Sequence, residues 1–265
     1  MHDPRSTNPA RPPVVILAGG FGTRLAERTD ELPKPMVEIG GMPVLWHILK
    51  IFSAYGHDDF VIACGYRGSV IKRFFLEYRD RQSDLLIDYR TDRVERIDRE
   101  PEPWRIALVD TGPSTMTGGR VRRVRPHLPG RTFMMTYGDG VANVDLDALL
   151  SFHRGHGCLA SMTVVQPPAR FGHPALDGER VMRFEEKPED GDRWINGGFF
   201  VLEPEVLDWI DGDETIFETD VLPRLAGADQ LRAFRHDGFW QPMDTLRDVR
   251  TLNGLWASDD PPWRI

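Results

Sequence analysis

A glycine-rich loop near the start of the chain has the residue types that bind phosphate. It follows the apolar run Val-Val-Ile-Leu-Ala at 14–18 and reads Gly-Gly-Phe-Gly-Thr-Arg up to Arg24. A buried strand that opens into glycines lets backbone N–H groups point at an anion. Arg24 adds bidentate donors for phosphate oxygens, and Lys34, ten residues further on, adds a compact positive charge. These residues predict a cradle for a phosphate or a polyphosphate.

The spacing of this loop differs from the two common nucleotide-binding fingerprints. Leu25 stands where the third glycine of a dinucleotide-binding G-x-G-x-x-G motif would let a helix pack close to the strand. The Gly-Lys-Ser/Thr that completes a P-loop does not follow. A dinucleotide-dependent oxidoreductase is therefore disfavoured, and the cations in the loop argue for phosphate binding of another kind.

Two aspartates supply hard oxygen ligands of the kind that Mg²⁺ prefers. Asp139 lies in Tyr-Gly-Asp-Gly directly after an apolar run, and Asp244 lies in Trp-Gln-Pro-Met-Asp-Thr, where a helix is expected to start. Each has an ordinary structural alternative, an Asp-Gly turn for Asp139 and a helix N-cap for Asp244. Mg²⁺ usually takes one or two protein carboxylates and keeps its other positions for water and phosphate, so this pair meets the needs of one ion.

The elements that must position these residues alternate between strands and helices. We expect strands at 14–18, 60–64, 85–89, 133–137, 159–165 and 199–202, and helices at 44–55, 69–78, 145–156 and 244–256. Ser69 is the expected N-cap of the second helix, and Gly157 is expected to close the third. Such alternation predicts an α/β fold with a mostly parallel, Rossmann-like sheet, helices on both faces and small β insertions. Ligands of such sheets bind at the carboxyl ends of strands, where the glycine-rich motifs lie.

Length and composition predict a single domain at 14–265. The chain has 265 residues, and 40% of them are hydrophobic, which is enough for the core of one large α/β domain. Residues 1–13 are polar and proline-rich and lack the apolar segment of a secretory signal, so we expect a disordered tail. The charged segment 80–103 is expected to be a solvated hairpin or loop, or else an arm that packs on a neighbouring subunit.

The charge balance and the cysteines exclude several classes of partner. The formal net charge of −8 argues against nonspecific nucleic-acid binding, which needs a basic face. No apolar run is long enough to span a membrane, so we expect no membrane partner. Cys64 and Cys158 are expected to be buried thiols in a reducing compartment rather than a disulfide framework. These features favour a cytoplasmic protein.

Taken together, the motifs resemble those of a known enzyme family. Leu-Ala-Gly-Gly-x-Gly-Thr-Arg-Leu followed by Pro-Lys-Pro-Met-Val resembles the sugar-1-phosphate nucleotidyltransferases, and later segments resemble their glucose-1-phosphate cytidylyltransferase branch. These segments stand in the family's order at 34–41, 110–112, 116–120, 136–140, 186–188, 195–200 and 239–248. The resemblance implies the nucleotide-diphospho-sugar transferase type of fold. It also implies transfer of a cytidylyl group from CTP to α-D-glucose 1-phosphate, which gives CDP-glucose and pyrophosphate.

The resemblance further implies roles for individual residues. The catalytic residues would be Arg24, Lys34, Asp139 and Lys187. The nucleotide-binding residues would be Leu17, Ala18, Gly19, Gly20, Phe21, Gly22, Thr23, Arg24, Lys34, Thr115, Arg120 and Gly138. The residues that bind the sugar phosphate would be Glu186, Lys187, Asn196 and Gly197. The ligands of a Mg²⁺ cofactor would be Asp139 and Asp244.

Two alternatives to this function remain open at the level of sequence. One is a transferase for another nucleotide or another sugar phosphate, because the Thr115 hydroxyl can serve either pyrimidine and because the loop 170–176, with its His173-Pro174 step, departs from the family pattern. The other is an inactive sensor of a nucleotide-sugar, which would usually lose the loop cations or the acids, all of which are present here. Members of the family form oligomers, often hexamers, so a homo-oligomer is expected.

Overall fold

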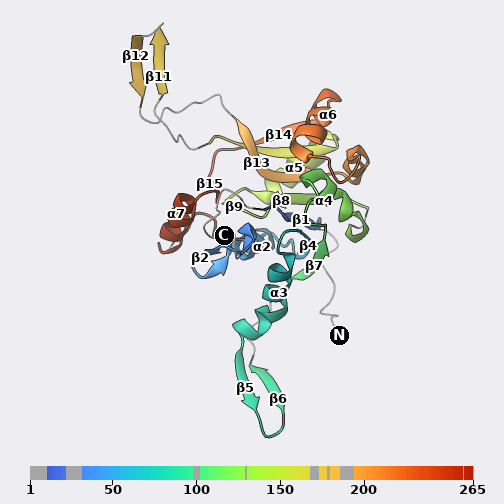
Figure 1. Ribbon diagram of the computed structural model, residues 1–265. Coiled ribbons are helices and arrows are strands. Elements are labelled where there is room, and N and C mark those ends of the chain that lie inside the picture. The colour runs from blue at the N-terminus through green and yellow to red at the C-terminus, as the bar shows by residue number, and fades with distance from the viewer. Residues whose placement is uncertain are drawn as a thin grey trace.

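A seven-stranded sheet forms the centre of the molecule (Figure 1). The computed structural model describes residues 11–21, 32–97, 102–128, 130–167, 173–177, 180–185, 194–258 and 260–264. In sheet order the strands are β14 (Leu231–His236), β10 (Ala160–Val165), β13 (Ile195–Leu202), β8 (Phe133–Tyr137), β1 (Val14–Ala18), β4 (Asp59–Cys64) and β7 (Arg105–Asp110). Among these strands β13 alone runs antiparallel to its neighbours. The predicted mostly parallel sheet is confirmed.

Strand β1 lies in the middle of the parallel part of the sheet, between β4 and β8. Val15 lies beside Val61 on one side and beside Met135 on the other. All five residues of β1 are buried. A strand covered on both faces needs apolar side chains at every position, which is why this segment is a continuous apolar run rather than an alternating one.

Helices cover both faces of the sheet, as predicted. Along β1, Val14 and Ile16 face one hydrophobic core, whereas Val15 and Leu17 face the other. The first core is covered by α2 (Val44–Ala54), α3 (Gly68–Gln82), α5 (Leu146–His156) and α7 (Leu246–Trp256). The second is covered by α4 (Thr117–Arg123), the 3₁₀ helix η4 (Pro204–Trp209), the π-helix η5 (Phe217–Val221) and α6 (Leu222–Gly227).

The helix ends agree with the sequence signals in α5 but not in α3. Gly157 ends α5 in the left-handed conformation, and the Asp145 side chain caps its start by accepting from the N–H of Ala148 at 2.9 Å. The prediction that Ser69 caps α3 was wrong, because Arg67 holds the N-cap with a φ of 50° and the helix begins at Gly68. The turn after β4 closes before the chain reaches Ser69, so the preference of serine for caps was not used there.

The predicted small β insertions are present as four two-stranded pieces. They pair β2 (Glu38–Ile39) with β3 (Met42–Pro43), β5 (Asp84–Asp88) with β6 (Arg93–Ile97), β9 (Gly140–Ala142) with β15 (Trp240–Pro242), and β11 (His173–Asp177) with β12 (Arg180–Glu185). The charged segment 80–103 contains the β5–β6 hairpin, which extends away from the body beyond α3 (Figure 1). The expected hairpin is confirmed.

Three further expectations concern the tail, the cysteines and membranes. Residues 1–10 of the expected disordered tail lie outside the described residues. Both cysteines are buried free thiols, as predicted, and burial raises the pKa of Cys64 to about 11. In the part of the chain that the structure describes, every helix is too short or too polar to cross a lipid bilayer.

Candidate active site

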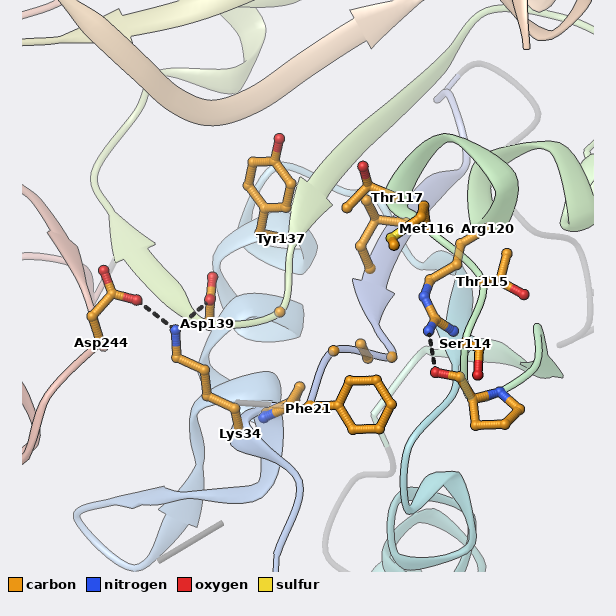
Figure 2. A pocket seen from close by; sticks show the side chains of 17 residues that line it. Phe21, Lys34, Ser114, Thr115, Met116, Thr117, Arg120, Tyr137, Asp139 and Asp244 are labelled. Carbon is orange, nitrogen blue, oxygen red and sulfur yellow. Dashed lines mark hydrogen bonds and ion pairs between the residues drawn. The ribbon is translucent and has the colours of Figure 1, made fainter. Parts of the chain in front are cut away.

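A pocket of about 570 Å³ lies at the carboxyl ends of β1 and β8, the edge of the sheet where ligands are expected (Figure 2). The structure brings these predicted residues together around it: Leu17, Ala18, Gly19, Gly20, Phe21, Lys34, Thr115, Arg120, Gly138, Asp139 and Asp244. Its other lining residues were not predicted as site residues: Pro35, Pro113, Ser114, Met116, Thr117 and Tyr137. Of the other predicted residues, Asn196 and Gly197 are described but do not line the pocket, and five lie outside the described residues: Gly22, Thr23, Arg24, Glu186 and Lys187.

The Arg120 side chain forms the floor under the glycine-rich loop. Its guanidinium is buried and donates to the hydroxyl of Thr111 at 2.7 Å and to the carbonyls of Gly112 at 2.8 Å and Pro113 at 3.2 Å. A Cβ on Gly19 would lie 2.2 Å from Nη1 of Arg120, so only glycine lets the loop lie this close. Burial lowers the pKa of Arg120, and the nearby Arg123 charge adds to this. Arg120 thus holds the 111–113 loop beneath the pocket, and its contact with a nucleotide stays a prediction.

Lys34 lies between the two predicted metal ligands (Figure 2). Its Nζ is 2.6 Å from Oδ2 of Asp139 and 2.6 Å from Oδ1 of Asp244. Burial alone would lower the pKa of Lys34, but the charge of Asp139 and the hydrogen bonds to both carboxylates outweigh it and raise the pKa. The three side chains therefore form one charged cluster, here called the Lys34 cluster.

Three separate elements deliver the Lys34 cluster. Lys34 opens the 3₁₀ helix η2 (Lys34–Met36), and Asp139 follows β8 directly. Asp244 follows β15, which pairs with β9. Next to this pairing, the N–H of Met243 donates to the carbonyl of Asp139 at 2.8 Å. These contacts hold the loop of Asp244 against the loop of Asp139. The N-terminus of α7 is capped by Thr245 and Asp248 in a capping box. The alternative reading of Asp244 as the N-cap was therefore wrong, and its carboxylate is directed to Lys34 instead.

The donor set of the Lys34 cluster fits a hard divalent cation. Because both carboxylate oxygens are 2.6 Å from the same nitrogen, they are at most about 5.2 Å apart. A Mg²⁺ ion held by both carboxylates would replace the Lys34 ammonium as their shared positive partner and would keep its other positions for water and phosphate. Among the described residues, no group of three or more His, Cys, Asp or Glu side chains is placed to hold a metal. A Mg²⁺ site in this pocket would therefore rest on these two carboxylates together with water and phosphate.

The other side of β8 carries a hydrogen-bond network, of which sequence reasoning predicted only Asn196 as a site residue. The Tyr137 hydroxyl donates to Oε1 of Glu218 and accepts from Nδ2 of Asn196 at 3.3 Å. Oε2 of Glu218 accepts from the hydroxyl of Thr117 at 2.6 Å. Asn196 and Gly197 do not line the pocket themselves, but Tyr137 lines it and lies against Gly198. No local sequence signal marks Glu218, which lies in the short π-helix η5, a type of element often found at functional sites.

Comparisons with known proteins agree with this geometry. A model of the nucleotidyl transferase family matches residues 13–257. The chain is 51% identical over 251 residues to a glucose-1-phosphate cytidylyltransferase of Salmonella typhi, covering 94% of this chain and 98% of that protein. It is 39% identical to a probable glucose-1-phosphate cytidylyltransferase of Bacillus subtilis, covering 95% of this chain and 98% of that one.

Solved structures show the same fold at low sequence identity. The crystal structure of HddC from Yersinia pseudotuberculosis, complexed with GMP-PN, matches with a TM-score of 0.69 and 21% identity. The match covers 93% of this chain and 100% of the HddC chain. The predicted fold type is confirmed by this likeness, and the predicted resemblance to glucose-1-phosphate cytidylyltransferases is confirmed by the identity to curated relatives. This chain belongs to the nucleotidyl transferase family.

Proposed function

We propose that this chain transfers the cytidylyl group of CTP to α-D-glucose 1-phosphate and releases pyrophosphate. The observation that carries the proposal is the 51% identity, across nearly the full length of both chains, to an enzyme of that activity. The pocket supports it, because it combines a glycine loop, a buried arginine and the Lys34 cluster at one edge of the sheet. Lys34 and both acids, which a catalytically inactive sensor would usually lose, are present in the pocket.

Nucleotidyl transfer leaves the protein mainly with positioning and electrostatic work. In the proposed reaction, backbone groups of Gly19 and Gly20 lie against the nucleotide, and Thr115 and Arg120 line the base side of the pocket. Lys34 places positive charge at the triphosphate. Arg24, outside the described residues, would add a second cation there. A phosphate oxygen of the sugar attacks the α-phosphorus, and no general base is needed because a phosphate monoester is already an anion.

The remaining predicted roles concern the metal and the sugar phosphate. We propose that Asp139 and Asp244 hold Mg²⁺, which when bound neutralises triphosphate charge and polarises the bond that breaks. Lys187 and Glu186 would hold the incoming sugar phosphate, and Asn196 and Gly197 would face its hydroxyls. The bond from the Asn196 amide to Tyr137, which lines the pocket, supports this role.

The test is pyrophosphate release with Mg²⁺ and glucose 1-phosphate, run in parallel with CTP, UTP, dTTP, GTP and ATP. Release with CTP, with CDP-glucose identified by mass, is the expected result. Release with another nucleotide would retain the reaction class and overturn the choice of base. No release with any nucleotide, followed by none with a panel of other sugar phosphates, would overturn the enzymatic function itself.

We also propose that the protein is a cytoplasmic homo-oligomer, with a hexamer as the expected form, and that the β5–β6 hairpin packs on a neighbouring copy. A lone two-stranded hairpin is marginally stable in water, and this one leaves apolar side chains exposed on both strands. Leu86 and Ile97 are each 57% exposed. Light scattering of the full chain and of a variant with charged residues at both positions tests this, and an unchanged mass in the variant would contradict it.

A further inference from the structure

The Tyr137 hydroxyl joins two parts of the pocket that are far apart in sequence. Thr117 begins α4 beside the proposed nucleotide site, and Asn196, the second residue of β13, belongs to the proposed sugar site. Between them lie Tyr137, at the end of β8, and Glu218, in η5. The hydrogen bonds run from Asn196 to Tyr137, from Tyr137 to Glu218 and from Thr117 to Glu218. Here they are called the Tyr137 network.

The direction of each bond in the Tyr137 network is determined from both ends. The two carboxylate oxygens of Glu218 accept from the hydroxyls of Tyr137 and Thr117. At the other end, Oδ1 of Asn196 accepts from the N–H of Gly198 at 2.8 Å, which turns its NH₂ group toward Tyr137. The Tyr137 oxygen must therefore accept from Asn196 and direct its proton to Glu218. The two requirements agree, and the amide of Asn196 has a single orientation.

A fixed amide presents a defined group to a ligand. The NH₂ of Asn196 has two N–H donors, and Tyr137 takes one of them. Among the described residues no group accepts from the second, which is available to an acceptor such as the oxygen of a sugar hydroxyl. The backbone supports the same arrangement, because Gly198 has a φ of +83° and a Cβ there would lie 2.7 Å from the Tyr137 ring. The carbonyl of the adjoining Gly197 is already taken by the indole N–H of Trp240 at 2.8 Å.

We propose that Tyr137 and Glu218 are positioning residues for the sugar phosphate, which set the hydrogen-bond direction that makes Asn196 a donor to a sugar hydroxyl. This inference rests on the proposed function and assigns a role to two residues outside the Lys34 cluster. It predicts that the network affects binding of the sugar phosphate more than binding of CTP. Thr117 retains a second bond, from the N–H of Phe217 at 2.9 Å, so the nucleotide side keeps support when the network is cut at Tyr137.

The experiment measures KM for each substrate separately in the full-length enzyme. Tyr137→Phe removes only the hydroxyl and keeps the ring that lines the pocket. The expected result is a roughly tenfold rise in KM for glucose 1-phosphate, the scale of one ordinary hydrogen bond, with KM for CTP within about twofold of wild type. Tyr89→Phe, on the β5–β6 hairpin, makes the same chemical change at a side chain that is 89% exposed and is expected to change neither KM.

Variants of Glu218 separate the effect of the hydrogen-bond acceptor from the effect of side-chain shape. Glu218→Leu removes the acceptor and is expected to raise KM for glucose 1-phosphate as Tyr137→Phe does. Glu218→Gln keeps a carbonyl that can accept from Tyr137, so it is expected to restore KM to within about threefold of wild type. In the double variant of Tyr137→Phe with Glu218→Leu, the second change should add little, because both cut the same chain. Glu214→Gln, at an exposed position near η5, is the matched control.

Distinct outcomes overturn the inference and the function on which it rests. An unchanged KM for glucose 1-phosphate in Tyr137→Phe overturns the inference, and so does an equal rise in both KM values, which would indicate that the network only holds the fold. A wild-type enzyme that forms no CDP-glucose overturns the proposed function instead. Thermal unfolding of each variant accompanies the kinetics, so that loss of folded protein is measured rather than read as a change in KM.

Discussion

Two polar clusters lie at the end of β8, two residues apart in sequence, and they are built on different principles. The Lys34 cluster, which includes Asp139, consists of full charges at 2.6 Å. The Tyr137 network consists of hydrogen bonds whose direction is set by one carboxylate. Charge attracts from any angle, whereas a hydrogen bond needs a donor facing an acceptor. The first cluster suits a polyphosphate and a metal, and the second suits hydroxyl groups whose positions distinguish one sugar from another.

The largest effect is expected in the Lys34 cluster. Asp139→Asn keeps the size of the side chain but removes a charge that we assign to the metal site. We expect kcat/KM to fall about a hundredfold or more, the scale for one essential electrostatic group. Steady-state pyrophosphate release measures this, with Asp88→Asn on the β5–β6 hairpin as the control. A fall of less than about threefold would remove Asp139 from the catalytic machinery.

Lys34→Met should cause the next largest fall in kcat/KM, and its effect on the melting temperature should depend on salt concentration. Removal of the ammonium leaves two carboxylates at most about 5.2 Å apart without their shared partner. We expect a fall in kcat/KM of roughly tenfold to a hundredfold and a lower melting temperature of the ligand-free protein. Because salt screens repulsion between charges, the loss in melting temperature should shrink between low and high salt. Tyr137→Phe should show no such salt dependence, and equal behaviour of the two variants would end the distinction between the clusters.

Gly19→Ala tests the close contact between the glycine-rich loop and the Arg120 side chain at the floor of the pocket. The added methyl would lie 2.2 Å from the Arg120 guanidinium, so either the loop or Arg120 must move. We expect a loss of about 1–3 kcal/mol in the free energy of unfolding, the range for overpacking, and a higher KM for CTP. Gly20→Ala is the control, since a Cβ there meets nothing within 4 Å. Equal stability of the two variants in urea would contradict the buried placement of Arg120.

The smallest effect concerns Cys64, which lies under the glycine loop next to Arg120. Burial raises its pKa from 9.0 to about 11, so the unfolded thiol ionises before the folded one as pH rises. The unfolded state is then favoured progressively between about pH 9 and pH 11, and the contribution of Cys64 to stability falls in that window. The thiol itself should resist a disulfide reagent at pH 8 until the protein unfolds. Rapid labelling of the native protein would show that the floor is open to solvent.

The charged cluster could be predicted from sequence, whereas the network could not. Lys34, Asp139 and Asp244 each stand in a distinctive motif, and charged residues beside glycines and strand ends have few structural alternatives. Glu218 has no motif of its own, and the 136–140 motif that contains Tyr137 carries no sign of a partner 81 residues away. Their contact exists because η5 packs on the same face of the sheet that β8 presents with Tyr137. Packing between elements that are distant in sequence cannot be predicted from a local sequence pattern.

Local sequence was sufficient for five of the seven strands of the central sheet and for α2, α3, α5 and α7, but it did not predict β7, β14, α4 or α6. Continuous burial on both faces requires the apolar run of β1, and Gly157 ends α5 because it adopts the left-handed conformation without strain. The tertiary structure alone decided which groups meet. It placed Lys34 between the two aspartates, turned Arg120 under the loop rather than toward solvent, and started α3 at Gly68 instead of after Ser69. The physical reason is the sequence distance over which each effect acts. Helix and strand propensities and hydrophobic periodicity depend on residues a few positions apart. Ion pairs and the direction of hydrogen bonds depend on residues far apart in sequence that only the folded sheet brings together.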